Sequence, residues 1–374
     1  MLSPLSIGAR SLDDYLDFLD EEALAEMLRL AEPWREVPVR FLSPACKGSH
    51  AEVLESLVPL LKGLGIQVDW NILMPDPEVE AVFVGLRGAL QGAPFEWTPA
   101  KRQIFADFSA RLQEALPRDD GFKVLYHPLP VLEAAEGWHW WSSLDMRKPE
   151  ATVWESLRGR IDRFDRLLLP SKLAGPDSHS VLAPALDPLH PRNLPMERER
   201  ANAIVENFGL DPNRPLLLQI GRFDPWKDPL GVIEAYRLVK EQVPDLQLVL
   251  LGHLEPGDKE AWAYFNWSLR RTGEDFDVFI LTDQNGVGPF EINAFQRVAD
   301  VVLQKSVNDA FSLAAAEAQW KGQPVIAGNV GGLPVQIIEG QTGFLVDSVE
   351  DCAMRIYHLL KNPGESWEMG EMAR

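Results

Sequence analysis

Apolar runs of strand length alternate with longer amphipathic stretches along the whole chain. The apolar runs cover Val37–Ser43, Ile66–Leu73, Phe122–Tyr126, Trp138–Asp145, Arg166–Pro170, Ser180–Pro184, Leu216–Ile220, Leu246–Leu251, Val278–Thr282 and Asp300–Leu303. Apolar residues at helical spacing predict helices over Ser11–Leu30, Ala51–Lys62, Glu78–Gln91, Pro99–Leu116, Thr152–Phe164, Glu197–Phe208 and Gly231–Gln242. Because strands that alternate with helices build parallel sheets, the sequence predicts an α/β fold with two Rossmann-like domains.

A proline-rich stretch without periodicity separates the two halves. It reads PALDPLHPRNLP from Pro184 to Pro195, a composition typical of a linker. We therefore predict an N-terminal domain over residues 1–190 and a C-terminal domain over residues 191–374.

The stretch Val301–Gly332 predicts a ligand-binding strand end in the second domain. It contains a strand, a loop, a helix over Ala310–Trp320 with Asn308 or Asp309 as its N-cap, a second strand and a glycine-rich loop. Ligands of parallel α/β sheets collect at such strand ends, against helix N-termini whose free N–H groups attract anions. Asp309 and Glu317 stand eight residues apart, which is about 12 Å along a helix axis. That is too far for one acid–base pair, but the two carboxylates could hold opposite ends of an extended ligand.

Composition narrows the classes of protein. With 56 acidic and 36 basic residues the formal net charge is −20, which argues against a surface for nucleic acid or anionic membrane but allows a local basic pocket. Cys46 and Cys352 are far apart, so neither a disulfide framework nor a zinc site is expected. No apolar run reaches the ~20 residues of a membrane span. Because the acidic N-terminus also lacks the pattern of a signal peptide, we expect a cytoplasmic protein.

Two motifs resemble the donor-sugar site of GT-B glycosyltransferases, in the large retaining family that includes sucrose synthase-like and trehalose-forming enzymes. An acidic residue, seven residues and then glutamate is the signature of that family, and Asp309 and Glu317 keep this spacing with Asp for the usual Glu. The block QIGRFDPWKDPLGVIEAY, Gln219–Tyr236, is more specific, because it is similar to the RFDPWKDP segment of trehalose glycosyltransferring synthases and trehalose phosphorylases. Leu281–Ser306 continues the resemblance, which is strongest after Pro215.

The resemblance implies a GT-B fold, with an acceptor-side domain and a donor domain facing a cleft, and a role for each matching residue. Arg222 would fork two oxygens of the leaving diphosphate, Lys227 would act on it as a point charge, and Asp309 would hold the sugar. Glu317 would bind the ribose hydroxyls. Without the resemblance, these would be ordinary surface charges. The other donor-binding positions are Ala310, Phe311, Ser312, Leu313, Asn285 and Gly48.

The first half departs from the family's pattern in three places. The loop Ala45–His50 retains only Gly48 of a glycine-rich loop. Relatives carry aspartate in a DPQP-like loop where this chain has His127, and histidine in WRCHID where it has Ser143, whereas Asp145 persists. Core packing is the favoured interpretation of three neighbouring tryptophans that could also stack on a sugar ring, Trp138, Trp140 and Trp141.

The residues support two hypotheses from different classes. The first is a retaining glycosyltransferase that uses a nucleotide-activated hexose, preferably NDP-glucose, and a sugar acceptor, as in trehalose synthesis. No cofactor and no metal are expected, because Arg, Lys and helix N–H groups would take the metal's place. The second is a catalytically degenerate GT-B homologue kept for nucleotide or sugar binding, regulation or assembly, since the donor half matches and the acceptor half is altered.

The expected partners are a nucleoside diphosphate sugar and a sugar acceptor, with no nucleic acid and no membrane. The nucleotide base, the acceptor and the oligomeric state stay open, a homodimer included. Family members continue into a C-terminal helix that crosses back to the first domain, so the tail of this chain, which ends at NPGESWEMGEMAR, is expected to be truncated.

Overall fold

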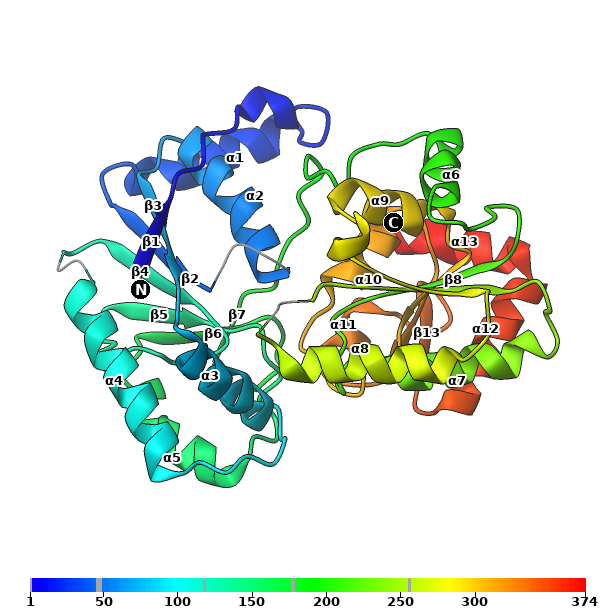
Figure 1. Cartoon of the computed structure of the whole chain (residues 1–374). Helices are drawn as coiled ribbons and strands as arrows, with labels where there is room; N and C mark the ends of the chain where they lie inside the picture. Colours follow the sequence, from blue (N-terminus) through cyan, green and yellow to red (C-terminus); the bar gives the residue numbers. More distant parts are fainter. Residues whose placement is uncertain (1, 45–48, 117–118, 176–178, 255–256) are drawn as a thin grey trace. The chain divides into compact units, whose positions relative to one another are not determined.

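The computed structural model describes residues 2–44, 49–116, 119–175, 179–254 and 257–374 (Figure 1). The chain forms two compact units, Met1–Leu189 and His190–Arg374. Within the described ranges, no helix has both the length and the apolarity that crossing a bilayer requires.

The first unit is built on a sheet whose described strands lie in the order β1-β3-β2-β4-β5-β6-β7. Strands β2 to β7 are parallel, whereas β1 is antiparallel to β3, with Leu2 opposite Leu73. Their bounds are β1 Leu2–Leu5, β2 Val39–Ser43, β3 Val68–Leu73, β4 Phe122–Tyr126, β5 Trp138–Trp141, β6 Arg166–Leu169 and β7 Ser180–Val181.

Most helices of this unit begin at side-chain caps. The Thr98 hydroxyl accepts a hydrogen bond from Lys101 N at 3.3 Å and so caps the helix that begins at Pro99. The prediction of one helix over Ser11–Leu30 is wrong, because the Asp20 carboxylate accepts from Ala23 N and starts a separate helix there. The bounds are η1 Leu12–Tyr15, α1 Glu21–Ala31, η2 Glu32–Trp34, α2 Ser49–Gly63, α3 Pro77–Leu90, α4 Pro99–Ala115 and α5 Ala151–Ile161.

The second unit holds a fully parallel sheet whose described strands lie in the order β10-β9-β8-β11-β12-β13. The strands are β8 Leu216–Ile220, β9 Gln247–Gly252, β10 Val278–Thr282, β11 Val301–Gln304, β12 Val325–Gly328 and β13 Gly343–Val346. The helices are α6 Arg198–Glu206, α7 Pro229–Lys240, α8 Lys259–Thr272, η3 Asp283–Asn285, α9 Pro289–Val298, α10 Leu313–Trp320, α11 Leu333–Gln336, α12 Val349–Lys361 and α13 Pro363–Ala373.

Each face of this sheet packs against its own helices. Leu217 lies in a buried cluster with residues of α7 and α12, such as Tyr236 and Ile356. Its neighbours on β8 point to the opposite face, where Leu218 lies in a cluster with Phe295 of α9. Because both faces are covered, the strands read as continuous apolar runs, which is typical of parallel sheets.

Candidate functional site

The predicted diphosphate residues lie where the order of the second sheet reverses. Neighbouring strands β8 and β11 start connections that run in opposite directions, toward β9 and β10 on one side and toward β12 and β13 on the other. Such a switch point leaves a crevice at the carboxyl ends of the strands, where open α/β sheets bind ligands. Arg222 and Lys227 follow β8, and Asp309 follows β11, so the topology brings residues far apart in sequence to one place.

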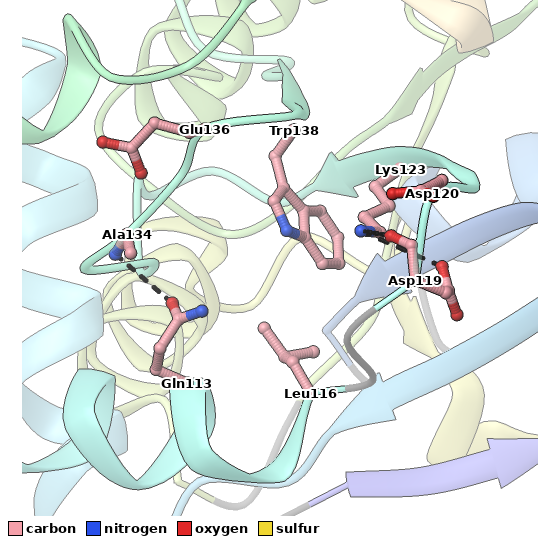
Figure 2. Close-up of a pocket in the computed structure, with 8 residues that line it drawn as sticks. All are labelled: Gln113, Leu116, Asp119, Asp120, Lys123, Ala134, Glu136 and Trp138. Atoms are coloured by element: carbon pink, nitrogen blue, oxygen red, sulfur yellow. Dashed lines mark hydrogen bonds and ion pairs between the residues drawn. The ribbon is translucent and has the colours of Figure 1, made fainter.

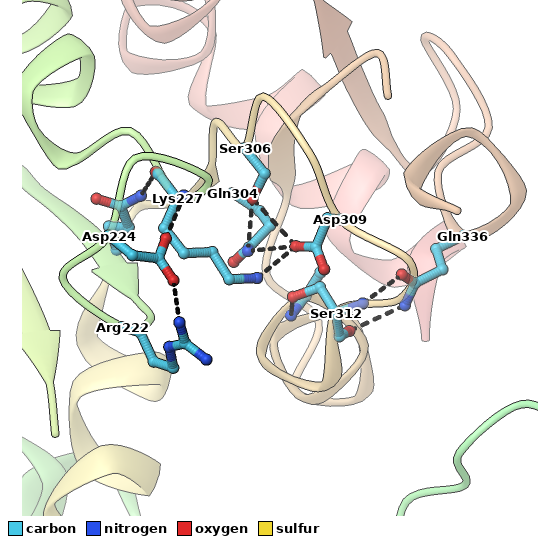
Figure 3. A network of polar contacts seen from close by, with 10 residues as sticks. Arg222, Asp224, Lys227, Gln304, Ser306, Asp309, Ser312 and Gln336 are labelled. Atoms are coloured by element: carbon cyan, nitrogen blue, oxygen red, sulfur yellow. Dashed lines mark hydrogen bonds and ion pairs between the residues drawn. The ribbon is translucent and has the colours of Figure 1, made fainter. Parts of the chain in front are cut away.

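An ion pair between Lys227 and Asp309 forms the centre of the site (Figure 3). Lys227 Nζ lies 2.5 Å from Asp309 Oδ2, and the same oxygen accepts from Gln304 Nε2 and Ser306 Oγ, each at 3.0 Å. Asp309 is 8% exposed. No hydrogen bond to its other oxygen, Oδ1, occurs within the described residues, so this oxygen remains an acceptor for a ligand.

Arg222 is held by a carboxylate that also positions Lys227. Asp224 Oδ2 lies 2.8 Å from an Arg222 terminal nitrogen, and Asp224 Oδ1 accepts from Lys227 N at 2.9 Å. Among the described residues, the buried Arg222 Nε has no hydrogen-bond partner. An anion that reached this guanidinium would therefore find a donor already desolvated, which strengthens the contact.

Two further contacts connect the loop after β8 to the loop after β11. The ammonium of Lys305 forms an ion pair with Asp228, and Val307 N donates to Trp226 O at 2.8 Å. Asp228 has a left-handed backbone, φ 48°, and its side chain caps α7 by accepting from Gly231 N at 3.0 Å. These contacts fix the backbone on both sides of Lys227.

Glycine is required beside this site at the end of β12. A Cβ on Gly328 would lie 2.0 Å from the carbonyl oxygen of Ser306, inside its van der Waals radius. The backbone after β11 therefore approaches β12 at a distance that only glycine permits.

The helix after Asp309 begins later than predicted. Neither Asn308 nor Asp309 is its N-cap, because α10 starts at Leu313 and the Ser312 hydroxyl accepts from Ala315 N at 3.1 Å. The Gln336 side chain holds Ser312 extended by accepting from its N–H at 2.8 Å and donating to its carbonyl at 2.9 Å. The 12 Å separation along a helix, expected for Asp309 and Glu317, therefore does not apply.

The predicted phosphate-binding backbone is only partly available. Gln336 already occupies the N–H of Ser312. Ala310 is buried at 2% exposure, whereas Phe311 and Leu313 are half-buried. The run Ala310–Leu313 lies beside the ion pair, as expected, but its donors are not all free.

Glu317 is a buried carboxylate instead of a helix-surface one. Its Oε1 lies 3.1 Å from Arg192 Nε, and its Oε2 accepts from Gln296 Nε2 at 3.2 Å. Lys321, one turn later, donates from Nζ to the Glu317 carbonyl and to Asn193 Oδ1, each at 3.1 Å. The proline-rich segment Pro184–Pro195 thus supplies two side chains, Arg192 and Asn193, that contact the second half of α10 and the lysine that follows it.

Asn285 lies at the carboxyl end of β10, beyond the neighbouring strands β8 and β9. Its Oδ1 accepts from Thr282 N at 2.9 Å and from Thr282 Oγ1 at 3.1 Å. The residue is exposed, and its side chain shapes the turn that follows β10.

The site residues predicted in the first unit are partly outside the described residues and partly held by contacts within the unit. Gly48 and the three residues before it lie outside the described residues. His127 is buried, and its Nδ1 accepts from Leu129 N at 2.9 Å. Asp145 is buried and bound by the Arg147 guanidinium, with a closest approach of 2.6 Å. Ser143, half-buried, stands between these two positions in sequence.

The three tryptophans of β5 are core residues, which is the interpretation that the sequence favours. Trp138 and Trp141 are each 5% exposed and Trp140 is fully buried. The Trp140 indole donates to His127 O at 2.7 Å, which connects the two altered loops of this unit.

Sequence reasoning missed Gln304, Ser306 and Arg192. Gln304 and Ser306 lie within Leu281–Ser306, the stretch that continues the family resemblance. They are polar residues at the end of an otherwise apolar strand, and this pattern could have identified them as site residues. Arg192 lies in a segment without periodicity, and its burial against Glu317 depends on tertiary structure alone. Within the described residues, no three His, Cys, Asp or Glu side chains gather as a metal ion would require.

Comparisons with known proteins place the chain. The family described as glycosyl transferases group 1 matches residues 201–374, and the trehalose synthase N-terminal domain matches residues 43–172. The trehalose synthase of Pyrococcus horikoshii is 36% identical over 99% of this chain and 92% of its own length. That of Rubrobacter xylanophilus is 36% identical over 100% of this chain and 94% of its own.

Solved structures agree on the fold. The α,α-trehalose 6-phosphate synthase of Burkholderia multivorans superposes with a TM-score of 0.68 at 12% identity, covering 90% of this chain and 94% of that one. Anabaena HepE in complex with UDP-glucose gives a TM-score of 0.62 at 16% identity, covering 90% and 93%. The predicted GT-B fold, two Rossmann-like sheets in one chain, is therefore confirmed, and the protein belongs to the trehalose synthase family of group 1 glycosyltransferases.

Proposed function

We propose that this protein transfers a glucosyl group from a nucleoside diphosphate glucose to a sugar acceptor, preferably glucose, with retention of configuration at the anomeric carbon. The observation that carries the proposal is the charge arrangement at the switch point between β8 and β11. Two cations, Arg222 and Lys227, lie there beside a buried carboxylate, Asp309, one of whose oxygens accepts no hydrogen bond from the described residues. That UDP-glucose binds a protein of this fold supports the choice of donor.

Each side chain has a distinct task in this reaction. The guanidinium of Arg222 and the ammonium of Lys227 stabilise the negative charge that develops on the diphosphate as the bond from the anomeric carbon to the phosphate oxygen breaks. Asp309 Oδ1 accepts from a sugar hydroxyl and orients the ring. Its Oδ2, with three donors, cannot move without breaking those contacts. Preorganisation of this kind lowers the barrier because little rearrangement is needed during the reaction.

The bonds balance without a protein nucleophile. The acceptor hydroxyl oxygen attacks the anomeric carbon from the face that the diphosphate leaves, and its proton passes to the departing phosphate oxygen. The products are a disaccharide and a nucleoside diphosphate. Glu317 contributes at the ribose, at the far end of the donor from the reacting carbon.

The test is direct synthesis. The protein is incubated with glucose and UDP-, ADP- or GDP-glucose, the disaccharide is separated by chromatography, and its anomeric configuration is read by proton NMR. An α,α-linked product is expected with the wild-type chain and loss of at least ~100-fold in kcat/KM with Lys227→Met, the scale of losing one transition-state contact. Arg270→Ala serves as the control, since this arginine is exposed on α8. Product of inverted configuration, or unchanged turnover in Lys227→Met, would contradict the proposal.

The degenerate alternative is less well supported than the enzyme. Two relatives that align with this chain almost end to end, and so in both halves of the sequence, are named trehalose synthase. Nucleotide binding in calorimetry, without turnover on any of the three donors, would bring the alternative back.

A further inference from the structure

A cavity opens in the first unit at the amino-terminal edge of its sheet (Figure 2). Its volume is about 440 Å³, within the range of small-molecule sites. Lys123, near the start of β4, and Trp138, at the start of β5, line it, and the two strands are parallel. His127 follows the other end of β4. Because five strand residues span roughly 13 Å, the cavity is well separated from the carboxyl-end edge where this fold class binds its substrates.

An indole N–H that has no partner among the described residues faces this cavity. Trp138 is only 5% exposed, and among the described residues nothing hydrogen-bonds to its Nε1. Figure 2 shows that nitrogen on the side of Gln113 and Glu136. Three other buried indoles of the unit do have partners: Trp70, Trp97 and Trp140 donate to Ser43 Oγ, Ser156 Oγ and His127 O. Trp141 has no partner among the described residues either, but it does not line the cavity. A donor that opens onto a cavity and has no protein partner among the described residues favours a ligand that accepts a hydrogen bond.

The rim supplies further donors and acceptors. Gln113 Oε1 accepts from Ala134 N at 3.3 Å, so its amide NH₂ points its two donors elsewhere. The carboxylate of Glu136 is exposed and has no partner within the described residues. Asp119 is neutralised by Arg40 at 2.5 Å and approached by Lys123 at 3.8 Å.

This mixture selects one chemical class. A cation would meet the N–H groups of Trp138 and Gln113, and an anion would meet the carboxylate of Glu136. A neutral polyhydroxylated compound satisfies both kinds of group, because each hydroxyl both donates and accepts. We propose that the cavity is a second sugar-binding site of this protein, for a free hexose or a disaccharide. The proposal goes beyond the transfer reaction, since binding here requires neither a nucleotide nor turnover.

The experiment observes Trp138 directly. The protein, which has 12 tryptophans, is labelled with 5-fluorotryptophan, and the ¹⁹F resonance of Trp138 is assigned by its absence in Trp138→Phe. Glucose and trehalose are titrated without nucleotide. A saturable shift of that resonance is expected, and Glu136→Gln should raise the apparent Kd about tenfold, as expected for a hydrogen bond to a charged acceptor. Glu133→Gln is the matched control, because Glu133 is exposed on the same loop and does not line the cavity.

Other outcomes overturn the proposal. A shift that Glu136→Gln leaves unaffected would show that sugar acts from the catalytic edge. A response to putrescine and not to either sugar would assign the cavity to cations. No response to glucose or trehalose would mean that the cavity binds no sugar. These results do not depend on whether transfer occurs, because the titrations contain no nucleotide. Disaccharide synthesis by the Glu136→Gln variant is measured separately and is expected to be unchanged.

Discussion

The ion pair between Asp228 and Lys305 should couple the two loops that carry Lys227 and Asp309. Asp228 is the one non-glycine residue with positive φ in the described chain, and its carboxylate both caps α7 and binds the Lys305 ammonium. The Lys305 side chain is 9% exposed and that of Asp228 25%. Replacing the better buried partner and the more exposed one should therefore have unequal effects.

The magnitudes follow from what each change leaves behind. Asp228→Gly leaves the buried Lys305 ammonium without its partner, which should lower the free energy of unfolding by about 3–5 kcal/mol. Glycine is about 1 kcal/mol more favourable than aspartate at a left-handed position and only a few tenths of a kcal/mol less favourable as a helix cap. The net loss of stability is therefore about 2–4 kcal/mol. Lys305→Met leaves a partly hydrated carboxylate that still caps the helix, at about 1 kcal/mol. With both partners removed the loss should also be near 1 kcal/mol, a coupling of about 2–4 kcal/mol.

The assay is urea unfolding of the wild type, the two single variants and the double variant, followed by tryptophan fluorescence. Asp228→Asn extends the cycle, because asparagine tolerates the left-handed backbone and can cap the helix without the charge. Single-variant losses that add within about 0.5 kcal/mol in the double variant would refute the reasoning, since independent sites behave that way.

Four other outcomes are expected. Arg222→Ala should weaken nucleoside diphosphate binding by about 1.5–3 kcal/mol in calorimetry and leave nucleoside binding unchanged. Glu317→Gln should weaken nucleosides and diphosphates alike, and a loss confined to the diphosphate would contradict its ribose role. Burial lowers the pKa of Lys321 to about 7 from 10.5, so between these pH values the unfolded chain binds a proton that the folded protein lacks. The free energy of unfolding should therefore rise from pH 7 to 10.5, by at most about 1.4 kcal/mol per pH unit, and Lys321→Met should remove that slope. Ser143→His should raise disaccharide synthesis if a histidine there supports transfer, and unchanged kcat would show that this chain does not need one.

Local patterns predict most of the strands, although not β1 and β13, and they predict the site's fine geometry poorly. The bounds of Phe122–Tyr126, Leu216–Ile220 and Val278–Thr282 are predicted to the residue, because turn-forming or charged residues flank each apolar run. The topology then places the loops after β8 and β11 together, since parallel strands share one carboxyl edge.

What escapes the sequence depends on partners distant in the chain. Composition alone predicts that the helix begins at Ala310. Gln336, 24 residues away in sequence, instead holds Ser312 extended, and the helix begins at the next residue, Leu313. Glu317 is predicted as exposed or as a ribose ligand, but its contact with Arg192 across the linker segment makes it buried. Neither contact leaves a periodic signal, because each depends on the packing of loops.

The antiparallel strand β1 has a consequence for handling the protein. It covers the edge of β3, with Pro4 paired to Asn71 and Leu5 to Trp70. Removing these few residues would uncover a row of unpaired backbone groups flanked by Trp70 and Ile72, both buried in the intact sheet. Exposed apolar strand edges recruit other chains. Versions of the protein that lack residues 2–5 should therefore aggregate more readily than the full chain.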